Sequence, residues 1–227
     1  TTEGALSLKL ELSQIIDGYG GSEHAFPVTP LGKDMVEFVA RSGSAYTTTL
    51  MISHGGPPGQ DYFIARDNQH DDPKYRRFTP HFAADTKMRS QRWHIDSDYS
   101  FPAVAAGAAA IQRAGGTVGI GAHGELPGIG YHWEMEAHAM GGMTPTEVLH
   151  AATIGGARTI GRAAEFGSIE AGKYADLVIL DADPRADIRN ARRIAQVMKN
   201  GRLYEGATLD EIWPRARPHE APWFTER

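Results

Sequence analysis

The 227-residue sequence contains no cysteine. Disulfide bonds and thiolate metal ligands are therefore excluded, so a metal ion would have to be held by histidine and carboxylate side chains. Ten histidines make such a site possible in composition. The lack of cysteine does not distinguish a cytosolic protein from an exported one.

Long apolar runs and long basic runs are also absent. The most apolar stretch, residues 101–111, is mostly alanine and is shorter than the roughly 18 residues that a membrane helix requires. The formal net charge is −5. We therefore expect neither a membrane span nor a nucleic-acid partner.

The apolar spacing predicts alternating helices and strands. Helices are predicted at 5–17, 30–42, 101–114, 133–140 and 145–160, and strands at 22–28, 45–52 and 117–122. This order predicts parallel β/α units, but three strands do not close a barrel, so these residues are predicted to be part of a larger structure. Residues 53–97 show no periodicity and are expected to form a functional lid or a disordered segment.

The C-terminal residues have a different pattern. Short strands are predicted at 167–169, 175–181 and 194–204, and Asn200-Gly201 is a strong hairpin-turn signal. A small β module is therefore predicted to follow the α/β part.

Two stretches carry a family resemblance. GSIEAGKYADLVILDADP, followed by VMKNGRLYEG, resembles the C-terminal signature of the amidohydrolase superfamily, and GGMTPTEVLHAATIGGARTIG is similar to the helix pair before it. The resemblance implies an α/β fold in which residues 1–163 are the C-terminal half of a (β/α)8 TIM-like barrel. Residues 164–227 would be the C-terminal strands of a small β-sandwich domain and a tail.

A narrower resemblance covers nearly the whole chain. DGYGGSEHAFPV, SGSAYTTTLMI and EIWPRARPHEAPWF look like amidohydrolases fused behind a bacterial β-propeller, close to the imidazolonepropionase and prolidase-like branch. This likeness implies metal-dependent hydrolysis of a C–N bond in an amide, a peptide or a cyclic amide. It also implies a periplasmic location and a chain that begins at the end of barrel strand five.

Enzymes of this superfamily place their metal ligands at the C-terminal ends of barrel strands. His24 matches the histidine of strand six, with a structural imidazole as the alternative. Glu3 lies near the end of strand five, where a histidine is usual. It is a candidate carboxylate ligand, and the alternative is a glutamate favoured at a helix start.

His123 stands where the family has the strand-eight aspartate. A histidine can bind metal or accept a proton, but it cannot supply the negative charge that offsets two metal ions. The resemblance therefore implies one divalent ion, of the zinc type, rather than two. Glu125 is a candidate for the lost catalytic carboxylate.

Two further histidines are candidates for substrate binding. His132 follows a glycine-rich loop, and His54 follows the strand predicted at 45–52. The remaining histidines are predicted to be surface or structural residues: His70, His81, His94, His138, His150 and His219.

The ligand set implied by the resemblance is incomplete, because no His-x-His occurs in the sequence. We expect the N-terminal portion of the same protein to be bound as a separate chain, since half a barrel would expose strand edges. A homo-oligomer is left open.

Two other readings stay open. If Thr1 arises by self-cleavage, it could act as an N-terminal nucleophile, although accidental proteolysis also gives such a start. The incomplete ligand set is also compatible with a degenerate, non-catalytic barrel used for binding.

Overall fold

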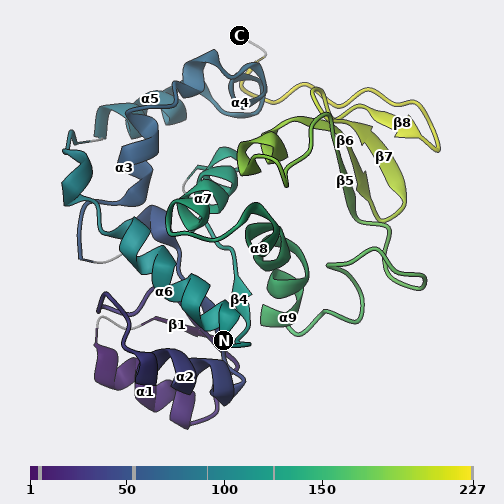
Figure 1. Ribbon diagram of the computed structural model, residues 1–227. Helices are drawn as coiled ribbons and strands as arrows, with labels where there is room; N and C mark the ends of the chain where they lie inside the picture. Colours follow the sequence, from purple (N-terminus) through teal and green to yellow (C-terminus); the bar gives the residue numbers. More distant parts are fainter. Residues whose placement is uncertain (5–6, 53–54, 91, 125, 226–227) are drawn as a thin grey trace.

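The computed structural model describes residues 1–4, 7–52, 55–90, 92–124 and 126–225 of the chain. These residues form two separate four-stranded sheets, with most of the helices packed around the first (Figure 1). The described residues include no helix that has both the length and the apolar character needed to cross a membrane.

The first sheet is entirely parallel. Its strands, in spatial order, are β1 (Thr2–Glu3), β2 (Gly21–Glu23), β3 (Ala45–Thr47) and β4 (Val118–Gly119). Thr2 pairs with Ser22, Ser22 with Tyr46, and Tyr46 with Val118. This register brings the carboxyl ends of all four strands to one edge. β1 was not among the predicted strands, and the other three are shorter than predicted.

All the predicted helices are confirmed among the described residues, although their ends differ from the prediction. They are α1 (Leu8–Ile16), α2 (Lys33–Ser42), α6 (Phe101–Arg113), α7 (Ile129–Met140), α8 (Pro145–His150) and α9 (Gly156–Thr159). A π turn at Ala151–Gly155 joins α8 to α9. Thr144 and Glu147 form a capping box at the start of α8, as the Thr-Pro-x-Glu pattern indicates.

The main core lies between the parallel sheet and its helices. Ile15 of α1, Val39 of α2, Ile111 of α6 and Val118 of β4 are all buried in one cluster. Each such side chain contributes roughly 1.5–3 kcal/mol through removal of apolar surface from water. The same burial fixes the helices relative to the strand ends that carry the site.

Residues 53–97 differ from the prediction, because those that the structure describes are largely helical. They form α3 (Gly59–Ile64), α4 (Pro73–Phe78), α5 (His81–Ser90) and two short 3-10 turns. Helices of six residues are too short to show a clear period. One local signal was present: Asp72 caps α4 by accepting from the N–H groups of Lys74 and Tyr75, with Pro73 at the first helical position.

The strand predicted at 45–52 ends early. β3 stops at Thr47, Thr49 has a left-handed φ of 51°, and Leu50–Ile52 forms a 3-10 turn. The reason is a long-range contact, since the two side-chain oxygens of Glu134 accept the N–H groups of Leu50 (2.6 Å) and Met51 (3.0 Å).

The second sheet is antiparallel and contains β5 (Leu177–Leu180), β6 (Ile194–Lys199), β7 (Arg202–Glu205) and β8 (Glu211–Trp213). The predicted hairpin is confirmed, with Asn200 (φ 49°) and Gly201 (φ 76°) in the left-handed conformation that a tight turn requires. The prediction of a strand at 167–169 is wrong. Gly167 has a left-handed backbone, with φ 95°, and lies so close to Ala157 of α9 that an added Cβ would be 2.6 Å from Ala157 Cβ. β8 was not predicted.

Candidate functional site

His24 is the first residue after β2, at the carboxyl edge of the parallel sheet. Its backbone is left-handed, with φ 76°, and only 9% of the residue is exposed. A left-handed backbone in a residue other than glycine costs about 1–3 kcal/mol and persists where the surroundings impose it. The fold therefore holds this imidazole in a fixed position.

Glu3 meets His24 across the neighbouring strand. β1 and β2 pair Glu3 with Glu23, and the Glu3 Oε1 atom lies 2.9 Å from His24 Nε2. The Glu3 side chain is 80% exposed and remains open to water. Glycine at position 4 permits this approach, because a Cβ there would lie 2.2 Å from the Glu23 carbonyl oxygen and 3.0 Å from His24 Cβ.

His123 reaches the same edge from the loop that follows β4. It also has a left-handed backbone, with φ 59°. Its ring centroid lies 5.6 Å from that of His24, with the two planes tilted by 50°. Three of the predicted site residues, Glu3, His24 and His123, therefore gather at one edge of the sheet.

In chemical type these three side chains fit a divalent cation. Zinc takes imidazole nitrogen and carboxylate oxygen. The three are too widely spread to close a site alone: among the described residues, the one set of three possible donors with all atoms within 4.8 Å is His70, His81 and Asp85. An ion at the carboxyl edge would need further donors.

Of the other predicted residues, His54 and Glu125 lie outside the part of the chain that the structure describes. Thr1 lies at the amino end of β1, where a Cβ on Gly21 would lie 2.9 Å from Thr1 Cγ2. The parallel register therefore places Thr1, the possible N-terminal nucleophile, before β1 and away from the carboxyl edge where His24 lies.

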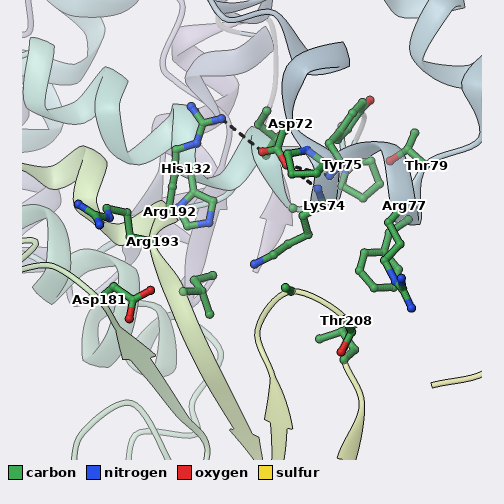
Figure 2. A pocket seen from close by; sticks show the side chains of 18 residues that line it. Asp72, Lys74, Tyr75, Arg77, Thr79, His132, Asp181, Arg192, Arg193 and Thr208 are labelled. Atoms are coloured by element: carbon green, nitrogen blue, oxygen red, sulfur yellow. Dashed lines mark hydrogen bonds and ion pairs between the residues drawn. The ribbon is translucent and has the colours of Figure 1, made fainter. Parts of the chain in front are cut away.

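His132 faces a different cavity. It lies in the first turns of α7 and lines a space of about 820 Å³ between α4 and the antiparallel sheet (Figure 2). Neither His24 nor His123 lines this space. Burial, together with nearby Arg192 and Lys74, lowers the pKa of His132 to about 4, so its imidazole is neutral at pH 7.

Positive charge dominates the wall of this cavity. The charged lining side chains are Lys74, Arg77, Arg192, Arg193, Asp72 and Asp181. Arg192 Nη2 lies 3.7 Å from Asp72 Oδ2 (Figure 2). This ion pair connects the 3-10 turn before β6 to the start of α4. Arg192 also pairs with Asp67, so the excess of positive charge comes from Lys74, Arg77 and Arg193, and it favours a negatively charged ligand group. Sequence reasoning missed these residues, because they come from distant segments.

A buried polar cluster lies behind β3, and sequence reasoning missed part of it. Glu134 and His138, one turn apart on α7, are both fully buried. His138 Nδ1 lies 2.8 Å from the Glu134 carbonyl oxygen, so Nδ1 carries the proton and Nε2 accepts from Thr48 Oγ1 at 3.1 Å. Burial lowers the pKa of His138 to about 4. His138 was predicted to be either structural or on the surface, and the structure shows it fully buried in a structural role.

Burial also raises the pKa of the Glu134 carboxyl to about 8, although the N–H groups of Leu50 and Met51 oppose the shift. Because the Glu134 oxygens hold the turn after β3, this cluster shapes the backbone at the carboxyl edge of the sheet.

Comparisons with known proteins agree with this architecture. An imidazolonepropionase from Shouchella clausii is 49% identical over 73 residues, which is 30% of this chain and 16% of that protein. A crystal structure of a Xaa-Pro dipeptidase with bound methionine superposes with a TM-score of 0.59 at 21% identity, over 89% of this chain and 44% of that one. The crystal structure of a putative prolidase from Bifidobacterium longum superposes with a TM-score of 0.58 at 23% identity, over 96% of this chain and 47% of that one.

The chain spans less than half the length of these solved structures. At such identities the superpositions concern the fold. The model of the Amidohydrolase family matches residues 5–204, which is most of the sequence. The chain therefore belongs to the Amidohydrolase family.

Proposed function

We propose that this chain carries part of the active site of a metal-dependent hydrolase of C–N bonds. The observation that carries the proposal is the pair His24 and His123. Both have left-handed backbones at the carboxyl edge of the parallel sheet, and their rings lie 5.6 Å apart. Strain of this kind concentrates at functional sites.

The residues take separate roles in this proposal. His24 and Glu3, 2.9 Å apart, would hold one zinc-type ion, with His123 as a third donor or as the proton acceptor. When bound, such an ion supplies positive charge that lowers the pKa of water and polarises a carbonyl group. A neutral imidazole at position 123 can take up the proton that water loses on attack. Glu125 and His54 stay predictions for catalysis and substrate binding.

The proposed substrate class is an amide, a peptide or a cyclic amide. It is supported by the relatives, which include an imidazolonepropionase and a Xaa-Pro dipeptidase. His132 stays a prediction for substrate binding, because it lines a cavity that neither His24 nor His123 lines.

The domain division is also part of the proposal. Residues 1–163 would be the C-terminal half of a (β/α)8 barrel, and residues 164–227 part of a β-sandwich and a tail. The four parallel strands β1 to β4, each followed by helical structure, support the first assignment. The four antiparallel strands support the second.

An N-terminal portion of the same protein is proposed as the partner. β1 forms an edge of the parallel sheet, and an exposed edge is a template for further pairing. On the antiparallel part Ile169 (88%), Val178 (57%) and Trp213 (58%) are exposed. Such apolar surface is consistent with strands that a partner would cover.

The experiment uses the full-length protein and a panel of Xaa-Pro dipeptides, N-acyl amino acids and cyclic amides. We expect zinc-dependent hydrolysis of at least one class, and a fall in kcat/KM of about 100-fold or more in His24→Ala and His123→Ala. His219→Ala, in the exposed tail, is the control and should keep full activity. Equal activity in the parent protein and in all three variants would contradict the assignment of His24 and His123 to the active site. If the protein binds zinc but hydrolyses no compound of the panel, the alternative of a non-catalytic barrel used for binding is favoured.

A further inference from the structure

A second group of ligating side chains lies in the segment between β3 and α6. His81 and Asp85 are four residues apart on α5 and therefore face the same way. His70 lies in the 3-10 turn at Gln69–Asp71, just before α4. One donor atom from each of the three side chains lies within 4.8 Å of the others. None of the three belongs to the group around His24.

Each imidazole of this set faces one oxygen of the Asp85 carboxylate. His70 Nε2 lies 3.3 Å from Asp85 Oδ1, and His81 Nδ1 lies 3.4 Å from Asp85 Oδ2. Both are longer than a good N–H···O bond. The two distances run to different oxygens of the Asp85 carboxylate, and one donor atom from each of the three side chains lies within 4.8 Å of the others, so the carboxylate and both imidazoles face a common space.

We propose that His70, His81 and Asp85 bind a zinc-type divalent cation, distinct from the ion proposed at the carboxyl edge. Two imidazoles and one carboxylate are a donor set that zinc prefers, with water in the fourth position. The His81 side chain is 78% exposed, and those of His70 and Asp85 are 29% and 25% exposed. An ion can therefore reach the site from solvent.

Arg89 is the competitor for this site. Its Nη2 atom lies 3.4 Å from Asp85 Oδ2, and its side chain is 82% exposed. Exposed ion pairs of this kind contribute little to stability. The guanidinium can therefore swing into solvent and leave the carboxylate to the cation.

The site would act on the neighbouring cavity. His70 precedes α4 and His81 follows it, so an ion bound to both would tie together the two ends of that helix. Lys74, Tyr75 and Arg77 of α4 form one wall of the cavity that His132 lines. Binding of the ion would fix this wall and order the cationic surface there.

The test is a zinc titration of the full-length protein, with tightly bound ions counted after dialysis. Asp85→Asn and His81→Gln are expected to lose one ion, or to bind it more than about 10-fold more weakly, since loss of even an outer-shell partner costs that much. Arg89→Gln should bind it more tightly. Zinc should also slow amide exchange across α4 in the parent protein but not in Asp85→Asn.

His94→Gln is the matched control. His94 and Asp98 lie four residues apart in the same segment, with His94 Nδ1 3.8 Å from Asp98 Oδ2, and the three-donor set does not include them. This variant should keep the full ion count. His24→Ala should lose a different ion and keep the zinc effect on α4. An unchanged ion count and affinity in both Asp85→Asn and His81→Gln would overturn the proposal.

Discussion

At the scale of single residues, the candidate site depends on backbone conformations that side chains rarely adopt. His24 and His123 both lie in the left-handed region, and neither position shows this in the sequence. The resemblance to the superfamily identified the two residues. Their strained backbones and the distance between their rings could come only from the structure.

Gly4 gives a direct test of how His24 is held. A Cβ at position 4 would lie 2.2 Å from the Glu23 carbonyl oxygen, so Gly4→Ala must push β2 away from β1. We expect the variant to lose most of the hydrolytic activity and of the zinc bound at His24 while it still folds. Gly20→Ala is the matched control, because nothing lies within 4 Å of its added Cβ. Equal loss in both variants would contradict this account.

Glu134 should make stability depend on pH. Burial raises the pKa of the folded Glu134 carboxyl to about 8, above its ordinary value of 4.5. The stability it contributes is therefore complete below pH 4.5 and is lost as pH rises toward 8. His138, with its pKa lowered from 6.5 to about 4, acts in the opposite direction, but only between pH 4 and 6.5. Between pH 6.5 and 8, the Glu134 effect acts without that opposition.

Urea unfolding at pH 6.5 and pH 8 measures this effect. The free energy of unfolding should fall by up to roughly 2 kcal/mol more in the parent protein than in Glu134→Gln, which cannot titrate. Glu134→Gln should also be less stable at pH 6.5 by about 1–3 kcal/mol, because one backbone N–H at Leu50 or Met51 loses its acceptor. The same pH dependence in both proteins would contradict the assigned pKa.

At the scale of elements, local signals predicted what local contacts determine. The helices from α6 to α9 and the Asn200-Gly201 hairpin were predictable, because apolar spacing, caps and turn residues lie close together in the chain. The end of β3 was not, because the carboxylate that caps its turn comes from Glu134, far along the sequence. α3 and α4 were missed because six residues are too few to show a period. The ten-residue α5 was missed because it has little apolar face: Ala84 is its buried residue, and Phe82 is 66% exposed.

The capping box of α8 can be tested in the same way. Thr144 Oγ1 accepts the Glu147 N–H, and the Glu147 carboxylate accepts the Thr144 N–H at 2.7 Å and pairs with Arg113 of α6. Thr144→Ala should lower the free energy of unfolding by about 1 kcal/mol. Thr146→Ala, at the exposed second residue of the same helix, should change it little. Equal effects in thermal or urea unfolding would show that the cap is not what holds this helix start.

At the scale of the whole molecule, we propose that further strands of the same protein complete the structure around the parallel sheet. The proposal is supported by the lack of a His-x-His in this sequence and by the described Glu3, His24 and His123, which do not close a metal site alone. We therefore expect the N-terminal portion to co-purify with this chain when the two are expressed as separate polypeptides. Recovery of this chain alone as a stable, zinc-loaded hydrolase would contradict the proposed partner.

The most direct measurement is anomalous diffraction at the zinc edge from crystals of the full-length protein grown with zinc. The account predicts an anomalous peak within bonding distance of His24 and Glu3 at the carboxyl edge of β1 and β2, close to His123. Zinc peaks elsewhere, with none at that edge, would contradict the claim that these residues hold the catalytic ion.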